Sequence, residues 1–132
     1  MIRKDPLSIF PDFTADSHWH DDIEMILTVS GHMMYNVNGE TIRLEEGEGI
    51  FINGRQLHFG FSDDKTECTY ICILFHPLIL CSSEMFEQQY VIPLLQADLP
   101  FVHLSPGIGW QNTILKSINA ICERKDTDTG PL

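Results

Sequence analysis

Short runs of apolar residues, separated by turn residues, fill most of the chain from residue 22 to residue 75. In residues 23–29 every odd position is apolar, whereas Glu24 and Thr28 occupy even positions, so the two sets of side chains point to opposite faces of a strand. Further strands are expected at residues 33–37, 40–44, 50–52, 58–61 and 66–75. Short strands at this spacing predict an all-β antiparallel sandwich or barrel.

Turn residues mark where the strands are joined. Asn38-Gly39 separates two strands and suits the positive φ angles of a type I′ turn, which predicts a two-residue hairpin. Residues 45–49 and 53–56 predict polar corners, and residues 63–65 turn the chain into the last strand of this region. That last strand is apolar on both faces, so we expect both faces to be covered.

The pattern changes after residue 76. A serine cap, acidic residues in the first turn and Pro93 predict a short helix that begins near Glu84, and residues 101–104 predict one more strand. Helical spacing follows over residues 108–124, and the polar residues 125–132 are expected to fray. We therefore divide the chain into a β-barrel domain, residues 1–104, and a C-terminal helical element, residues 105–132.

The C-terminal helix carries one apolar stripe at steps of three and four residues. Its members are Ile114, Leu115, Ile118, Ile121 and Cys122. Together with Trp110, this stripe forms either a dimer seam or a cover for the outside of the sheet, and both interpretations are open.

Composition excludes several classes of function. The chain has 132 residues, enough for one domain, and its 8 basic and 19 acidic residues give a formal net charge of -11. Such a surface repels nucleic-acid phosphates and anionic membranes, so we expect no direct DNA contact and no membrane contact. The start of the chain does not resemble a secretory signal, and no apolar run suits a membrane helix. Four cysteines without framework spacing suit free thiols in a cytoplasmic protein.

The candidate chemistry lies in His18, His20, Glu24 and His58. Three imidazoles and one carboxylate form a ligand set that zinc, iron, manganese or nickel accepts. His18 and His20 face the same way on a strand, but Glu24 would lie about 13 Å beyond His20 on a straight one. The chain must therefore turn back at Asp21-Asp22 for the four side chains to meet. His32, His76 and His103 have no partner at ligand spacing.

These residues resemble a known family. The pattern His18-x-His20-x3-Glu24-x6-Gly31 is similar to the first signature of the cupin superfamily, and residues 47–58 resemble a degraded second signature that lacks its proline and its asparagine. Residues 15–80 more closely resemble the N-terminal sensing domain of AraC-type transcription regulators. The segments that carry this likeness are His18 to Glu24, Val37 to Glu40, Leu44 to Gly47 and Ile52 to His58.

The resemblance implies a cupin-type double-stranded β-helix, a jelly-roll-like barrel followed by one or two C-terminal helices. It also implies a small-molecule effector, such as a sugar or another small metabolite, a homodimer, and a separate helix-turn-helix module that contacts DNA. No such module follows residue 108, so we expect a non-enzymatic regulatory fragment whose DNA-binding part is missing from this chain.

Within such a barrel, we expect an effector to contact interior residues. The candidates are His20, Glu24, Ile26, Tyr35 and His58, with Met25, Met33, Met34 and Phe51 as further apolar residues that either line a cavity or form plain core.

Two further choices are open. Either His18, His20, Glu24 and His58 bind a metal, or His20 and Glu24 only hydrogen-bond each other. Cys68 and Cys72 are either a redox sensor or buried structural thiols.

The rivals of the regulator hypothesis are a metal-dependent cupin enzyme of dioxygenase or isomerase type, which would use the same four ligands, and a stand-alone sugar-binding or scaffold cupin.

Overall fold

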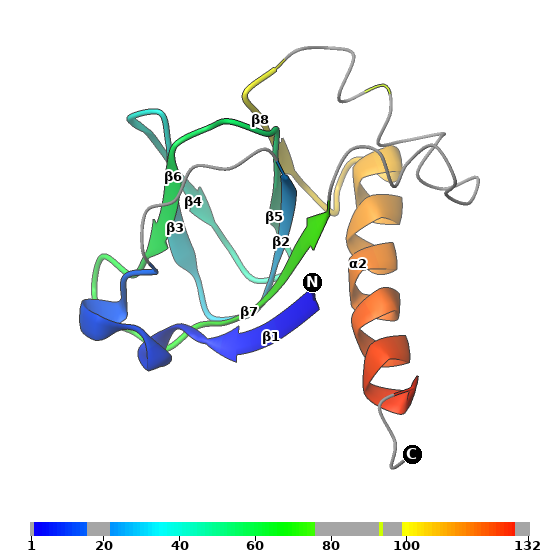
Figure 1. Ribbon diagram of the computed structural model, residues 1–132, viewed down its shortest axis with the longest axis horizontal. Coiled ribbons are helices and arrows are strands. Elements are labelled where there is room, and N and C mark those ends of the chain that lie inside the picture. The colour runs from blue at the N-terminus through cyan, green and yellow to red at the C-terminus, as the bar shows by residue number, and fades with distance from the viewer. Residues whose placement is uncertain (1, 16–21, 76–92, 94–98, 129–132) are drawn as a thin grey trace.

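Two antiparallel sheets and one long helix make up the described part of the molecule (Figure 1). The computed structural model describes residues 2–15, 22–75, 93 and 99–128. The five-stranded sheet has the order β1-β7-β2-β5-β8, and the three-stranded sheet has the order β4-β3-β6. The strands are β1 (Ile2–Pro6), β2 (Ile23–Ser30), β3 (Met33–Val37), β4 (Glu40–Leu44), β5 (Gly49–Ile52), β6 (His58–Phe61), β7 (Thr69–Phe75) and β8 (Phe101–Leu104). The helices are the 3₁₀ turns η1 (Leu7–Ile9) and η2 (Pro11–Phe13) and the α-helix α2 (Gly109–Asp128).

The predicted hairpin is confirmed. Strands β3 and β4 pair with Val37 opposite Glu40, and the turn residues Asn38 and Gly39 have φ angles of 53° and 90°. Positive φ at both central positions is the geometry of a type I′ turn. The Gly39 N–H also donates a hydrogen bond of 3.0 Å to the Asn36 side chain.

Alternation along β2 divides the core into two layers. Odd residues of β2 pack with α2 in an outer cluster, and even residues such as Ile26 belong to an inner cluster between the sheets. The outer cluster includes Ile23, Met25, Leu27, Phe51, Ile71, Ile73, Leu104, Ile114, Leu115, Ile118 and Cys122. The inner cluster includes Leu7, Ile26, Met33, Tyr35, Val37, Leu44, Ile50, Ile52, Cys68, Tyr70 and Cys72. The prediction that the last strand is covered on both faces is therefore confirmed for β7.

The apolar stripe of α2 covers the five-stranded sheet. Ile114 and Ile118 are fully buried there, and Leu115 and Cys122 are nearly so. Close approach is helped by Gly49 of β5, where an added Cβ would lie 2.7 Å from the Leu115 side chain. Of the two interpretations of this stripe, the sheet cover is confirmed, and the same residues are not available as a dimer seam.

Two boundaries differ clearly from the sequence predictions. Strand β7 begins at Thr69 rather than at residue 66, although the N–H of Leu7 donates a hydrogen bond of 2.7 Å to the Cys68 carbonyl and so continues the register of β1 with β7 by one pair. Helix α2 continues to Asp128, so the expected fraying from residue 125 is wrong up to that point; each residue added to a formed helix gains a backbone hydrogen bond. The helix expected near Glu84 lies outside the described residues.

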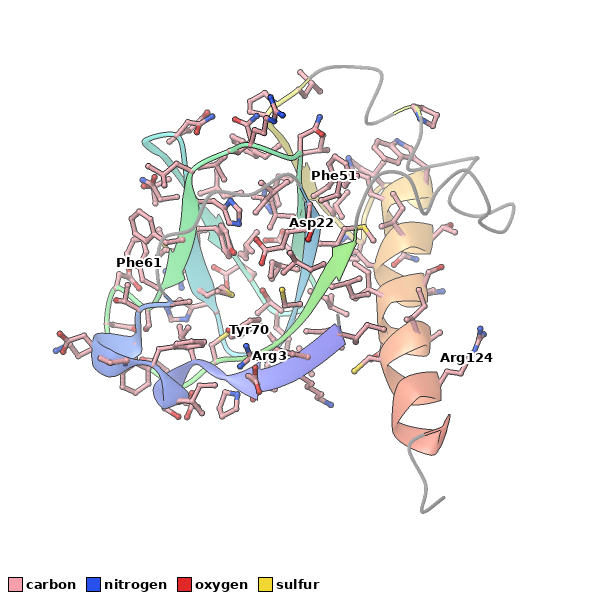
Figure 2. All side chains as sticks on the ribbon, viewed as in Figure 1. Arg3, Asp22, Phe51, Phe61, Tyr70 and Arg124 are labelled. Carbon is pink, nitrogen blue, oxygen red and sulfur yellow. The ribbon has the colours of Figure 1, made fainter. Side chains whose placement is uncertain are left out.

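Strand β1 is the element that the hydrophobic pattern did not indicate. Its residues are mostly charged or exposed, yet its backbone pairs with β7 from Ile2 to Pro6. Edge strands need only one partner and bury little side-chain surface, so alternation need not mark them. This strand carries Arg3 (Figure 2) and Asp5 to the partly exposed edge of the cavity described below.

Candidate functional site

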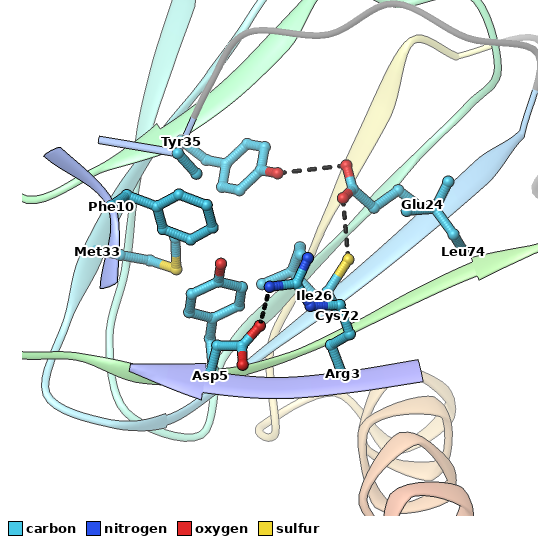
Figure 3. A pocket seen from close by; sticks show the side chains of 11 residues that line it. Arg3, Asp5, Phe10, Glu24, Ile26, Met33, Tyr35, Cys72 and Leu74 are labelled. Atoms are coloured by element: carbon cyan, nitrogen blue, oxygen red, sulfur yellow. Dashed lines mark hydrogen bonds and ion pairs between the residues drawn. The ribbon is translucent and has the colours of Figure 1, made fainter. Parts of the chain in front are cut away.

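A cavity of about 190 Å³ lies against the inner face of the five-stranded sheet. Strands β1, β2, β3 and β7 and the segment around η1 and η2 contribute its walls (Figure 3). The lining residues are Arg3, Asp5, Phe10, Ala15, Glu24, Ile26, Met33, Tyr35, Tyr70, Cys72 and Leu74. Most of these side chains are apolar or aromatic, with a few polar groups among them, which is the usual composition of a small-molecule pocket.

Glu24 is the polar centre of the cavity. It is 2% exposed, and both of its carboxylate oxygens accept hydrogen bonds: Oε2 from the Tyr35 hydroxyl at 3.3 Å and Oε1 from the Cys72 thiol at 3.0 Å. Oε2 also contacts Nε2 of His58, which is 1% exposed. Burial raises the pKa of Tyr35 and of Cys72, and the neighbouring carboxylate raises both further. Both groups therefore stay protonated and act as donors to Glu24 at neutral pH.

The geometry around His58 determines where its hydrogens lie. Nδ1 is 2.6 Å from the backbone carbonyl oxygen of Gln56, which only accepts, so Nδ1 carries a hydrogen and donates it. Nε2 contacts Oε2 of the Glu24 carboxylate. The Tyr35 ring stacks beside the imidazole with centroids 6.1 Å apart. A buried imidazole–carboxylate pair thus lies at the back of the cavity.

An ion pair on β1 forms another part of the wall. Arg3 and Asp5 are 2.7 Å apart, and their side chains are 50% and 22% exposed. The hydroxyl of Tyr70 belongs to the same wall, and burial raises its pKa. The sequence interpretation missed Arg3 and Asp5; their two-residue spacing, which places both on one side of a strand, was the available signal.

The predicted effector-binding residues are placed as follows. Glu24, Ile26 and Tyr35 line the cavity, and His58 lies behind Glu24. His20 lies outside the described residues.

The structure divides the further apolar candidates between the cavity and plain core. Met33 lines the cavity, but Met25 and Phe51 belong to the outer cluster against α2, because Met25 alternates with Glu24 along β2. Met34 alternates with Met33 and Tyr35 on β3 and is only half-buried.

The candidate metal ligands are described only in part. His18 and His20, together with Asp21 of the expected turn, lie outside the described residues. Glu24 and His58 do meet, through one oxygen and one nitrogen of types that divalent transition metals accept. The chemistry of this donor pair therefore fits a metal site.

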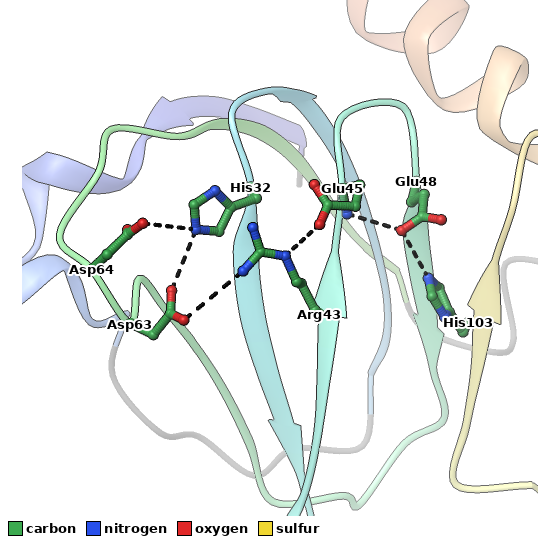
Figure 4. A network of polar contacts seen from close by, with 7 residues as sticks. All are labelled: His32, Arg43, Glu45, Glu48, Asp63, Asp64 and His103. Atoms are coloured by element: carbon green, nitrogen blue, oxygen red, sulfur yellow. Dashed lines mark hydrogen bonds and ion pairs between the residues drawn. The ribbon is translucent and has the colours of Figure 1, made fainter.

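A second polar network lies on the surface, away from the cavity (Figure 4). His32 Nε2 is 3.3 Å from Asp63 and 3.4 Å from Asp64, so the expectation that His32 lacks a partner is wrong. The pKa of Asp64 is lowered to about 2, chiefly because its carboxylate accepts a hydrogen bond from the backbone N–H of Thr66. Sequence spacing missed these contacts because 31 residues separate His32 from Asp63.

His103 has a partner as well, since its Nε2 lies 3.3 Å from Glu48. These surface contacts are at least partly exposed, which suits a solvated network of charges.

The thiols of Cys72 on β7 and of Cys68, just before this strand, are buried. Cys68 is fully buried, and burial raises its pKa to about 11, while Cys72 donates its thiol hydrogen to Glu24. A reactive thiol needs a lowered pKa. Their surroundings therefore favour buried structural thiols over a redox sensor.

Comparison with known proteins gives one family match. The model of the AraC-like ligand binding domain matches residues 8–101. Over 112 residues the chain is 35% identical to the protein named "Uncharacterized HTH-type transcriptional regulator YdeC" of Bacillus subtilis (strain 168), covering 82% of this chain. The chain spans 38% of the length of that relative.

One solved structure supports the fold, and a second is similar over part of the chain. A salicylate 1,2-dioxygenase from Pseudaminobacter salicylatoxidans matches with a TM-score of 0.51 at 21% identity, over 77% of this chain and 24% of that one. An RmlC-like cupin from Shewanella frigidimarina matches with a TM-score of 0.44 at 23% identity, over 50% of this chain and 57% of that one. The predicted fold, an all-β cupin-type barrel followed by a C-terminal helix, is confirmed. Among the described residues no helix is long and apolar enough to cross a membrane.

Proposed function

Because this chain belongs to the AraC-like ligand-binding domain family, we propose that it is the small-molecule-sensing domain of a DNA-binding transcription regulator. In this proposal a helix-turn-helix module outside these 132 residues contacts DNA, in keeping with the share of the regulator from Bacillus subtilis that the chain covers. The observation that carries the proposal is the cavity of about 190 Å³, whose walls include Glu24, Ile26 and Tyr35. As a transcription regulator it would work in the cytoplasm.

A ligand in the cavity contacts β2, the strand that also packs against α2 on the outer face of the sheet. Ile26 of β2 lines the cavity, and its neighbours Met25 and Leu27 pack in the outer cluster with Leu115 and Ile118 of α2. An effector that shifts β2 therefore acts on the packing of α2 through a single strand. Such a switch requires the effector to bind the two arrangements with different affinities, because equal binding shifts no equilibrium.

We propose that an effector contacts His20, Glu24, Ile26, Tyr35 and His58 and that no catalysis occurs. The carboxylate of Glu24 already accepts two hydrogen bonds and contacts an imidazole, so it serves as a fixed polar wall. Such prearranged groups orient a ligand without an additional ordering cost.

A metal-dependent cupin enzyme is the second candidate, favoured by the meeting of Glu24 with His58. In that case His18, His20, Glu24 and His58 would hold the ion, which would supply Lewis-acid chemistry. Metal analysis of the purified chain and of His58→Gln separates the two candidates. Stoichiometric metal that is lost in the variant favours the enzyme, and a metal content that the variant leaves unchanged favours the sensor.

Dimerisation is also part of the proposal. Since the stripe of α2 is buried within the chain, a dimer through this helix would use its exposed side, where Trp110 is 40% exposed and Ile108, just before the helix, 46% exposed. Sedimentation of the wild type and of Trp110→Ala tests this: a dimer that the variant weakens agrees with the proposal, and a monomeric wild type contradicts it.

The sensing proposal is tested by filling the cavity. Thermal unfolding of the purified chain is measured with a panel of pentoses, hexoses and single-ring aromatic compounds. We expect at least one compound to raise the melting temperature of the wild type and not that of Ile26→Trp, whose larger side chain fills the cavity. Glu40→Gln, at an exposed position of β4 outside the cavity, is the control and should respond as the wild type does. The proposal fails if no compound acts, or if Ile26→Trp folds and responds equally.

A further inference from the structure

The cavity also indicates what kind of molecule it binds, an inference that rests on the proposed sensing function. We propose that the effector is a neutral compound with a single aromatic ring and one polar substituent. The size of the cavity is the first argument. A dry cavity of about 150 Å³ accommodates benzene, and the cavity here measures about 190 Å³. It therefore holds one ring and a few further atoms.

The walls suit a ring better than a sugar. Phe10, Ile26, Met33 and Leu74 present apolar surface, and Tyr35 and Tyr70 add the faces or edges of aromatic rings. Aromatic pairs gain free energy beyond that expected from the area they bury. A ligand ring in this cavity therefore meets groups with which it packs favourably.

A sugar of similar volume would lack partners for most of its hydroxyl groups. Both oxygens of Glu24 accept hydrogen bonds, from Tyr35 and from Cys72, and Oε2 also contacts His58. The Arg3–Asp5 pair, 2.7 Å apart, is then left to match one polar substituent rather than several. Each hydroxyl buried without a partner loses its hydrogen bonds to water without replacing them. Several such groups would cancel the gain from burial.

The charged side chains among the described lining residues already have partners. Arg3 neutralises Asp5, and the Glu24 carboxylate is enclosed by the hydroxyl of Tyr35, the thiol of Cys72 and the imidazole of His58. An ionised ligand would leave water without meeting an opposite charge, and such burial is expensive. The cavity therefore favours a neutral ligand over a carboxylate or an ammonium ion.

The polar substituent is expected to face β1. Figure 3 shows the Arg3–Asp5 pair on that strand, whereas Glu24 stands with its donors on another wall. Since the Arg3 side chain is half exposed, it rearranges around a ligand at a lower cost in free energy than the buried Glu24 and His58 do. Arg3 donates and Asp5 accepts, so a hydroxyl or an amide is matched by both.

Three matched probes test this assignment. Benzyl alcohol, benzoate and benzylamine share one ring and one substituent carbon but differ in charge, and a pentose serves as the polar probe. Binding to the purified chain is measured by calorimetry. We expect benzyl alcohol to bind at least about tenfold more tightly than the other three. Ala15→Leu and Ile26→Trp, each checked for folding by circular dichroism, should abolish that binding because both residues line the cavity.

Charge variants sharpen the test. Asp5→Asn leaves Arg3 without its counter-charge and should move the preference toward benzoate, whereas Arg3→Gln should move it toward benzylamine. Tighter binding of the pentose or of an ion by the wild type, or no binding of any ring compound, overturns the assignment. Pentose binding that Ile26→Trp abolishes would overturn only the ligand class and would leave the sensing function supported. The absence of any response would overturn both.

Discussion

The buried pair of Glu24 and His58 makes the strongest prediction about stability. His58→Leu removes the imidazole and leaves the Glu24 carboxylate, 2% exposed, with Tyr35 and Cys72 as its hydrogen-bond donors. Breaking a buried pair by removing one partner costs about 3–5 kcal/mol. Glu24→Gln should reduce the free energy of unfolding by less, about 1–2 kcal/mol. The new amide donates to Nε2 of His58, and only one accepted hydrogen bond is lost.

The decisive measurement is whether the double variant is more or less stable than His58→Leu alone. Once His58 is gone, the charge on Glu24 is the source of the cost. Adding Glu24→Gln to His58→Leu should therefore restore at least about 1 kcal/mol of the free energy of unfolding. Urea unfolding at pH 7, followed by circular dichroism, measures all three variants, with m values checked for constancy. A double variant that is less stable than His58→Leu alone would refute the reasoning that the unpaired buried carboxylate is the source of the cost.

An exposed pair of the same residue types serves as the control. His103 and Glu48 lie 3.3 Å apart, with side chains 39% and 24% exposed. Solvent screens such pairs, so His103→Leu and Glu48→Gln should each change stability by no more than about 0.5–1 kcal/mol. The contrast between the two pairs then isolates the effect of burial.

Three further predictions follow from burial and close packing. Burial raises the pKa of the Cys68 thiol from 9.0 to about 11, so at pH 8 its thiolate should be about 100-fold rarer than in the unfolded chain. The contribution of the Cys68 thiol to stability is fully present below the pKa of the unfolded state and is lost as the pH rises through the pKa of the folded state. If a thiol reagent labels Cys68 at pH 8 as fast as in the unfolded chain, this prediction is contradicted. Gly60→Ala places a Cβ 2.6 Å from Met33 and 2.9 Å from the Tyr35 ring, so it should cost about 1–3 kcal/mol and weaken benzyl alcohol binding; unchanged unfolding and calorimetry would count against it. Ile118→Ala, at a fully buried position, should cost about 2–5 kcal/mol in urea unfolding and Trp110→Ala much less, and the reverse order would show that α2 packs through its other side.

Local patterns predicted most of the elements correctly. The Asn38-Gly39 turn, the alternation in β2 and the apolar stripe of α2 each depend on φ preferences or on periodicity within a few residues. Such signals are present in the chain before it folds, so they are readable from the residues alone. Alternation also placed Glu24 and Ile26 on the face that lines the cavity.

The candidate site was readable only in part. His58 was predicted to approach Glu24, but its contact with one carboxylate oxygen and its donation to Gln56 depend on how the two sheets pack. The sequence pattern did not indicate Arg3 and Asp5. Strand β1 is held by backbone pairing with β7, and such pairing does not require alternating apolar and polar side chains. His32 likewise meets Asp63 across 31 residues.

The sequence alone determined the family, the all-β class and which face of β2 is polar, because these follow from motif spacing, strand period and turn chemistry. Tertiary structure decided that the stripe of α2 covers the sheet and that Met25 and Phe51 belong to that outer layer. It also decided that Arg3 meets Asp5 and that His58 meets Glu24. Contacts between distant segments depend on the packing of whole layers, and periodicity along the chain does not encode which layer covers which face.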